Sequence, residues 1–219
     1  MTLGHRVCVL RDGQLQQVDT PQVLYDNPVN LFVAGFMGSP AMNFVSAEMI
    51  REAGPSVAFA GYRLPLPAGL LDAKPGLSGY LGRDVILGIR PSDFEDASLA
   101  DAEWARIGVT ANVTEELGSE IHVIFALDAP PIQHPSISDA VAGDDDADEA
   151  ATMLAGGKSL WTARVAARSR VRPGQPIELA VNTANLQFFD PTTGLSIGHP
   201  AASANGAATA EDPIVEDPA

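Results

Sequence analysis

Apolar and polar residues alternate along two short runs near the start of the chain, residues 6–10 and 14–19. Asp12-Gly13 lies between the two runs, and an Asp-Gly pair in that position predicts a tight β-hairpin turn. Cys8 lies within the first run, which indicates a small buried side chain and not a nucleophile. The pattern therefore predicts a β-hairpin over residues 1–20.

Two short helices are expected next. Thr20-Pro21 combines an N-cap residue with a proline at the first helical position, and Asn27-Pro28 ends that helix and starts another. The second helix carries the apolar residues 31–36, and Gly38-Ser39-Pro40 stops it. Residues 21–42 are therefore expected to form a helical linker.

The pattern changes beyond Asn43, where short β-prone runs alternate with Gly and Pro and no long helical period appears. Many short strands with turns between them predict a mainly β fold, and their modest lengths favour a small barrel. Leu117-Gly118-Ser119 is expected to turn a hairpin. The expected strands cover residues 57–66, 84–89, 106–114, 121–127, 160–165, 177–181 and 186–189.

Two segments differ from the rest in composition. Residues 136–157 contain an acidic run and end in Gly156-Gly157, which suits a surface insertion. Residues 199–219 consist mostly of Ala, Pro, Asp and Glu and offer almost nothing to bury, so they are expected to form a disordered tail.

Charge and cysteine content narrow the function classes. The chain has 28 acidic against 13 basic residues, a net charge of -15, and this field disfavours nucleic acid as a partner. Its single cysteine cannot form an internal disulfide and fits a reducing compartment. No apolar stretch approaches the length of a membrane span, so a cytoplasmic location is expected.

Several motifs are too incomplete to predict a site. Gly157-Lys158-Ser159 resembles the end of a P-loop, but Thr152 replaces the required glycine and a strand-like run follows where a helix is needed. Asp144, Asp146 and Asp148 have the spacing of a calcium loop without its later ligands. The histidines lie far apart in the sequence, so we predict no metal site; they are His5, His122, His134 and His199. We also predict no catalytic residue and no cofactor for this chain.

One basic cluster stands out in this acidic chain. It consists of Arg164, Arg168, Arg170 and Arg172. These residues could bind an anion, and they are the candidate ligand site of the sequence. The simpler interpretation is that their charges pair with nearby acids on a strand and the following loop. Both interpretations remain open from the sequence, although the scarcity of aromatic residues (6%) argues against nucleic-acid stacking.

Long stretches of the chain resemble the ATP-binding subunits of carbohydrate ABC importers of the maltose, glycerol-3-phosphate and trehalose type. The matching stretches are residues 6–21 (RVCVLRDGQLQQVDTP), 24–28 (LYDNP), 30–44 (NLFVAGFMGSPAMNF), 87–91 (LGIRP), 116–120 (ELGSE), 171–175 (VRPGQ) and 189–194 (FDPTTG). Ser92 departs from the family, which usually has Glu after Arg-Pro, and the insertion at 136–157 is longer than usual.

The resemblance implies an OB-like β-barrel of the TOBE class over residues 43–198, preceded by the last hairpin of an ATPase core (1–20) and a helical linker (21–42). It implies a regulatory and dimerisation role at the inner face of the plasma membrane. The family's ATP and Mg sites belong to elements expected before Met1, so this chain is not expected to be an enzyme.

The partners that the resemblance implies are a second copy of the chain, permease subunits contacted through the ATPase core, and a possible regulatory protein. The alternative is a free-standing barrel that binds an oxyanion or another small ligand at the arginine cluster.

Overall fold

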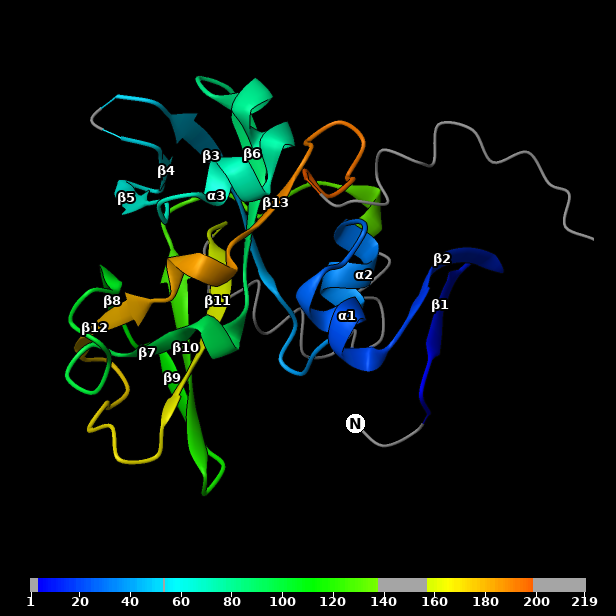
Figure 1. The fold of residues 1–219 in the computed structure, drawn as a ribbon. Coiled ribbons are helices and arrows are strands. Elements are labelled where there is room, and N and C mark those ends of the chain that lie inside the picture. Colours follow the sequence, from blue (N-terminus) through cyan, green and yellow to red (C-terminus); the bar gives the residue numbers. More distant parts are fainter. Residues whose placement is uncertain (1–3, 53, 138–156, 199–219) are drawn as a thin grey trace, which may run out of the picture.

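The computed structural model of the chain describes residues 4–52, 54–137 and 157–198 (Figure 1). The expected tail at 199–219 and most of the expected insertion, including Asp144, Asp146 and Asp148, lie outside the described residues. The strands are β1 (Val7–Arg11), β2 (Gln14–Asp19), β3 (Asn43–Ile50), β4 (Ser56–Phe59), β5 (Tyr62–Pro65), β6 (Asp84–Ile89), β7 (Phe94–Asp96), β8 (Ala105–Thr110), β9 (Val113–Glu116), β10 (Glu120–Leu127), β11 (Ser159–Ala166), β12 (Pro176–Val181) and β13 (Gln187–Phe189). The α-helices are α1 (Pro21–Asp26), α2 (Leu31–Phe36) and α3 (Leu70–Ala73), and the 3₁₀ helices are η1 (Pro75–Tyr80), η2 (Pro91–Asp93) and η3 (Thr183–Asn185).

The described strands form four antiparallel sheets. One is the hairpin β1-β2, and the other three have the orders β13-β6-β3-β4-β5, β7-β12-β8 and β11-β10-β9. We call these three sheets the sheet body. They enclose one core in which the buried Trp161 contacts the rings of Phe59, Phe94 and Phe125 at centroid distances of 5.7 to 6.2 Å. Three sheets that share one core make a mainly β, OB-like body, as the sequence predicts.

The sheet body is OB-like as expected, but its three sheets are not hydrogen-bonded into one continuous barrel. β5 and β8 are both edge strands of their sheets, and no strand pairing among the described residues joins them. A side chain bridges this seam instead, because the hydroxyl of Tyr62 in β5 donates a hydrogen bond of 2.5 Å to the Gly108 carbonyl oxygen in β8.

The expected strands are found with four differences, one of which is the short strand β7, which the sequence does not predict. The run 57–66 is the hairpin β4-β5, with Ala60 and Gly61 at positive φ in its turn. The run 106–114 divides between β8 and β9. Strand β3 was not among the expected strands, although its residues alternate between buried and more exposed positions.

The opening hairpin has the predicted turn, with Asp12 at φ 50° and Gly13 at φ 77°. Val9 points toward the helices and is buried, whereas the neighbouring Cys8 points the other way and is exposed. The prediction of a buried Cys8 was therefore wrong, because successive side chains of a strand face opposite sides and an apolar run does not say which side is covered.

The helices α1 and α2 lie between the hairpin and the sheet body (Figure 1). Thr20 caps α1 as predicted, and the side chain of Asn30 caps α2 by accepting a hydrogen bond from the Val33 amide. The second helix therefore begins at Leu31 and not directly at Asn27-Pro28. Its residues are buried on two sides: Phe32 and Val33 pack toward the hairpin, and Leu31 and Ala34 pack with Met42, Ile86 and Phe189 of the sheet body.

Arg90, which directly follows β6, joins the helices to the sheet body. Its guanidinium is buried and donates hydrogen bonds to the carbonyl oxygens of Tyr25, in the last turn of α1, and Met37, the C-cap of α2, with N–O distances of 3.0 and 2.6 Å. The guanidinium also lies 3.6 Å from the centroid of the Tyr25 ring. Burial lowers the pKa of Arg90, but an arginine begins so far above neutral pH that it remains charged. One cation therefore satisfies the carbonyl ends of both helices.

Gly38 makes room for this contact. It has φ 122°, and a Cβ atom at this position would lie 3.3 Å from a terminal nitrogen of Arg90. A side chain here would strain the backbone and press on the guanidinium.

We predict that Arg90→Ala lowers the free energy of unfolding by about 3 kcal/mol, because it leaves buried carbonyl groups at two helix ends without donors. The free energy of unfolding of Arg90→Lys should lie between those of the unmodified protein and Arg90→Ala, since one ammonium group cannot reproduce the planar set of donors of a guanidinium. Urea denaturation followed by circular dichroism measures the change.

The matched control is Arg83→Ala. Arg83 is exposed and lies over the Tyr80 ring at 5.2 Å, so its loss should cost at most about 1 kcal/mol. Equal destabilisation by Arg90→Ala and Arg83→Ala would contradict a structural role for Arg90.

Candidate functional site

The loop from β11 to β12 carries three of the four candidate arginines. Within this loop Ser169 and Val171 are buried. The residues that alternate with them are exposed, and these are Arg168, Arg170 and Arg172. The Ser169 hydroxyl accepts a hydrogen bond from the Val171 amide, and the Ser169 amide donates to the Ala166 carbonyl oxygen. The two buried residues thus hold the loop against the sheet body and direct the arginines outward.

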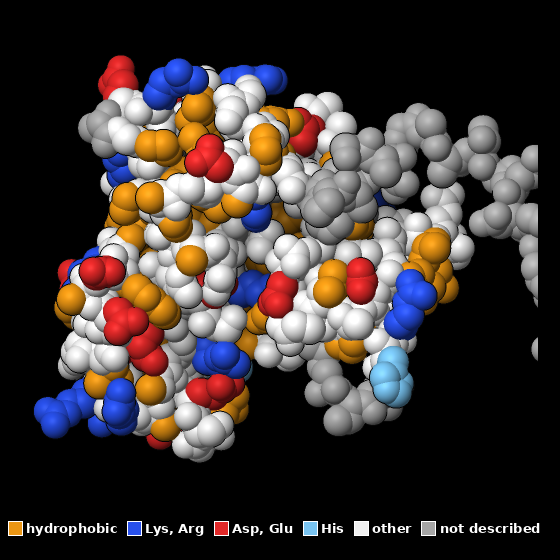
Figure 2. Space-filling model, viewed as in Figure 1, with side chains coloured by type: hydrophobic (Ala, Val, Ile, Leu, Met, Phe, Trp, Pro, Cys, Tyr) orange, Lys and Arg blue, Asp and Glu red, His pale blue; other side chains and the backbone are white. Residues whose placement is uncertain are grey.

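Arg170 and Arg172 line a surface cavity of about 420 Å³. Arg106 of β8 joins them, so the cavity has three arginines from two separate parts of the chain. Its polar lining also includes Ser98, Gln175, Asp96 and Glu178. Figure 2 shows basic side chains gathered at the lower left, where the β11–β12 loop lies in Figure 1. We call this cavity the arginine pocket.

The two carboxylates of the arginine pocket are already engaged. Glu178 forms an ion pair of 2.7 Å with Arg106. Asp96 accepts hydrogen bonds from the Ser169 hydroxyl (2.5 Å) and from the hydroxyl and amide of Ser98 (2.6 and 2.9 Å). Burial by itself would raise the pKa of Asp96, but these hydrogen bonds outweigh it and hold the pKa below its ordinary value. Asp96 therefore ties the arginine-bearing loop to β7 as a carboxylate.

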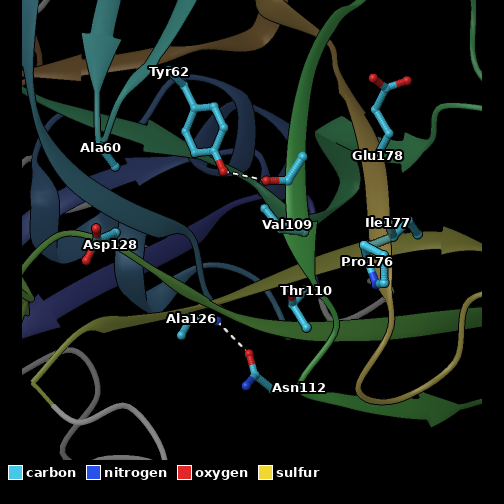
Figure 3. Close-up of a pocket in the computed structure, with 11 residues that line it drawn as sticks. Ala60, Tyr62, Val109, Thr110, Asn112, Ala126, Asp128, Pro176, Ile177 and Glu178 are labelled. Carbon is cyan, nitrogen blue, oxygen red and sulfur yellow. Dashed lines mark hydrogen bonds between the residues drawn. The ribbon is translucent and has the colours of Figure 1, made fainter.

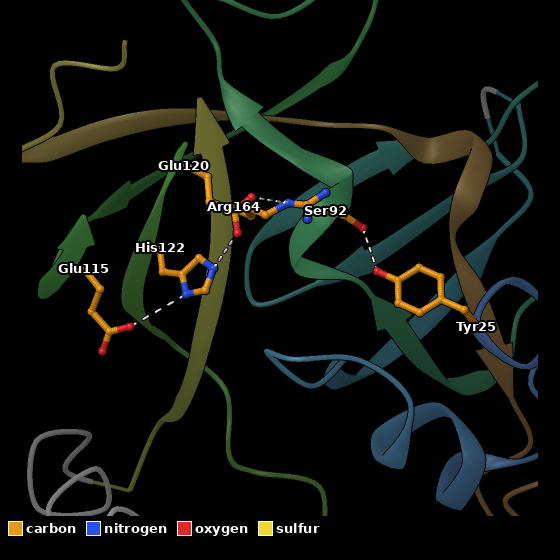
Figure 4. Close-up of polar contacts among 6 residues, drawn as sticks. All are labelled: Tyr25, Ser92, Glu115, Glu120, His122 and Arg164. Carbon is orange, nitrogen blue, oxygen red and sulfur yellow. Dashed lines mark hydrogen bonds and ion pairs between the residues drawn. The ribbon is translucent and has the colours of Figure 1, made fainter. Parts of the chain in front are cut away.

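The structure separates the other two candidates from the arginine pocket. Arg164 lies on the outer face of β11, where its side chain pairs with Glu120 at 3.5 Å. His122 is its cross-strand neighbour, and that ring lies 3.2 Å from Glu120 and 3.7 Å from Glu115 (Figure 4). Arg168 is exposed and lines none of the described pockets. Among the described residues, Arg164 is therefore the member of the cluster that pairs with an acid.

A larger cavity of about 590 Å³ lies beside the arginine pocket, at the seam between β5 and β8 (Figure 3). Tyr62 and Asn112 point into it, and both have partners: the Tyr62 hydroxyl bonds to Gly108, and the Asn112 side-chain oxygen accepts from the Ala126 amide. Asp128 on its rim pairs with Lys158 at 3.0 Å. Pro176, Ile177 and Glu178 line both cavities, so β12 forms the wall between them.

The described parts of the other motifs do not form sites. Gly157-Lys158-Ser159 leads into strand β11 and not into a helix, so it lacks the geometry of a P-loop. In the described ranges no group of three or more His, Cys, Asp or Glu residues could hold a metal ion. Among the same residues no helix is long and apolar enough to cross a membrane.

The sequence does not predict two contacts that the structure shows. Arg106 was not grouped with the cluster because it is more than sixty residues away in sequence, and only the pairing of β8 with β12 brings it there. Tyr25 and Ser92 form a hydroxyl–hydroxyl hydrogen bond of 3.0 Å between α1 and η2 (Figure 4). The departure at Ser92 was noticed in the sequence, but its partner could not be read from it.

We predict that Ser169→Ala raises the pKa of Asp96, because it removes the shortest hydrogen bond to that carboxylate. A carboxyl group whose pKa is depressed by folding contributes stability above its unfolded pKa, and that contribution is lost as the pH falls through the folded pKa. The acid-side loss of stability that Asp96 contributes should therefore be smaller in the variant and be complete at a higher pH. Carboxyl carbon chemical shifts measured against pH give the pKa directly.

Ser92→Ala is the control for this titration, since Ser92 bonds to Tyr25 and not to Asp96. Asp96 should titrate as in the unmodified protein. If Ser169→Ala also left the titration of Asp96 unchanged, the hydrogen bond would not be what depresses the pKa.

Comparison with known proteins agrees with this fold. Residues 38–94 match the family described as "MalK OB fold domain". The chain is 36% identical over 210 residues to the trehalose import ATP-binding protein SugC of Mycobacterium tuberculosis, covering 91% of this chain and 49% of that protein. It is 35% identical to the sulfoquinovosyl glycerol transport ATP-binding protein SmoE of Agrobacterium fabrum (90% and 45% covered).

A third relative, the trehalose/maltose import ATP-binding protein MalK of Thermococcus litoralis, is 34% identical over 200 residues, covering 90% of this chain and 45% of the relative. The chain thus spans about half the length of these curated relatives. It contains an OB-fold domain of the MalK type, and its relatives are named as ATP-binding subunits of importers for sugars and sugar derivatives.

Proposed function

We propose that this chain is the regulatory and dimerisation portion of the ATP-binding subunit of an ABC importer for sugars or sugar-like solutes. The observation that carries the proposal is the similarity of about nine tenths of the chain to three proteins that are all named as ATP-binding proteins of import or transport, for trehalose, for sulfoquinovosyl glycerol and for trehalose/maltose. The proposal therefore names a class of solute and not one sugar.

The β1-β2 hairpin supports an attachment to an ATPase core. Its inner side packs on the helices through Val9, and the buried Gln17 bonds to the Asn27 carbonyl oxygen and the Val29 amide. Its outer side leaves Leu10 and Leu15 more than half exposed, and Figure 2 shows apolar side chains gathered there. Among the described strands both edges of this two-stranded sheet are unpaired, so it is suited to extend a larger sheet whose core covers the apolar outer face. In this proposal that sheet belongs to the ATPase core of the parent subunit.

The proposal assigns different roles to the ATPase core of the parent subunit and to this chain. ATP and Mg bind to the core, which also contacts the membrane permease subunits and places the assembly at the cytoplasmic face of the membrane. The residues of this chain supply no nucleotide site. The sheet body keeps two subunits together and offers a surface to a regulatory protein. The buried contact of Arg90 supports this division, because it couples the sheet body to the helices that lead to the hairpin.

We predict that the chain self-associates weakly through the sheet body, with a dissociation constant on the order of micromolar. Association should strengthen as salt rises, because two bodies of net charge -15 repel each other and salt screens that repulsion. Sedimentation equilibrium at low and at high salt measures both effects.

A double variant, Leu10→Lys with Leu15→Lys, separates this association from adhesion between exposed hairpins. The variant should dimerise like the unmodified chain if the sheet body is the interface. A chain that stays monomeric at about 100 μM at both salt concentrations, or a dimer abolished by the hairpin variant, would overturn the dimerisation role.

A further inference from the structure

Two cations of the arginine pocket have no carboxylate partner among the residues that the structure describes. Arg106 forms an ion pair with Glu178, and the carboxylate of Asp96 accepts hydrogen bonds from Ser98 and Ser169. Among the residues that the structure describes, neither Arg170 nor Arg172 forms an ion pair; Arg172 donates one hydrogen bond, to the carbonyl oxygen of Val171. Two arginines that lie in one loop and line one pocket are suited to bind an anion.

The loop keeps these two arginines close together. Ser169 and Val171 are buried on either side of Arg170, and the hydrogen bond from Ser169 to Asp96 attaches the loop to β7. Because the backbone is held, like charges two residues apart cannot separate fully, and a bound anion would relieve their repulsion. A guanidinium binds phosphate oxygens through two parallel N–H donors, so a pair of arginines suits a doubly charged phosphate group.

The size and lining of the arginine pocket indicate more than a bare phosphate ion. A volume of about 420 Å³ lies within the range of small-molecule sites. Ser98, Gln175 and the outer oxygens of Glu178 offer hydrogen-bonding groups beside the arginines, and Pro176 and Ile177 provide an apolar wall. Hydroxyl groups on a compact carbon skeleton match this mixture of donors, acceptors and apolar surface.

We infer that the arginine pocket binds a small phosphate monoester of a polyhydroxylated compound, the class to which sugar phosphates belong. Arg170 and Arg172 bind the phosphate group, and Gln175, Ser98 and Glu178 contact the hydroxyl groups. Binding on this chain requires no ATPase core and no second copy, so the inference can fail or succeed independently of the proposed dimerisation.

The test is a titration of the full chain with glucose 6-phosphate, inorganic phosphate and glucose as separate probes, followed by amide chemical shifts. Glucose 6-phosphate should saturate and shift the amides of residues 170–175, and inorganic phosphate should bind more weakly at the same residues. Glucose alone should cause no saturable shift, because it lacks the charged group that the arginines bind.

Two double variants with the same charge change locate the site. Arg170→Gln with Arg172→Gln should weaken glucose 6-phosphate binding at least about tenfold, since each charged hydrogen bond contributes on that order. Arg164→Gln with Arg168→Gln removes two arginines of the same cluster that do not line the pocket and should leave the affinity unchanged. All four positions are exposed, so both variants should keep the circular dichroism spectrum of the parent.

Equal weakening by the two variants would show diffuse attraction to positive charge and overturn the inference. So would the absence of saturable binding of glucose 6-phosphate up to about 10 mM. Inorganic phosphate binding as tightly as glucose 6-phosphate would overturn the assignment of the hydroxyl contacts to Gln175, Ser98 and Glu178.

Discussion

The buried guanidinium of Arg90 is the contact on which the arrangement of the chain depends. A short helix leaves its last carbonyl groups without partners, and α1 and α2 have six residues each. Arg90 donates to the end of both helices and is stacked on Tyr25 of one of them. Burying a charge is costly unless it is fully hydrogen-bonded, so the helices and the sheet body stabilise this residue as much as it stabilises them. The hairpin, packed on the same helices, is placed by the same contact.

The arginine pocket is connected to Arg90 along the chain. Arg90, η2 and β7 follow one another, and Asp96 at the end of β7 ties the loop of Arg170 and Arg172 to the sheet body. Only five residues therefore lie between Arg90, which holds the helices, and Asp96, which holds the arginine loop. The segment between them is buried for most of its length, and it includes Phe94 in the aromatic core.

Local signals in the sequence were enough to predict individual strands, turns and helix caps. Contacts between residues that are distant in the sequence decide how these elements are arranged. The Asp12-Gly13 turn, the Thr20 cap and strand β10 are specified by residues within a few positions, and all three are as predicted. The strand β3 was missed, although its residues alternate between buried and more exposed positions. Three other features depend on which strands become neighbours. They are the side of the hairpin to which Cys8 points, the separation of Arg164 from Arg170, and the presence of Arg106 in the arginine pocket. That pairing is set by the packing of three sheets around Trp161 and cannot be read from spacing.

Native-state hydrogen exchange of the full chain tests the coupling through Arg90 most directly, because it reports the opening free energy of each amide. The account predicts that the amides of Ala34 and Met37, which are hydrogen-bonded in α2, open with free energies within about 1 kcal/mol of those in β6, since helices and sheet body unfold together. Opening of α2 at several kcal/mol below β6 would show that the helices separate from an intact sheet body, and it would contradict the central place given to Arg90.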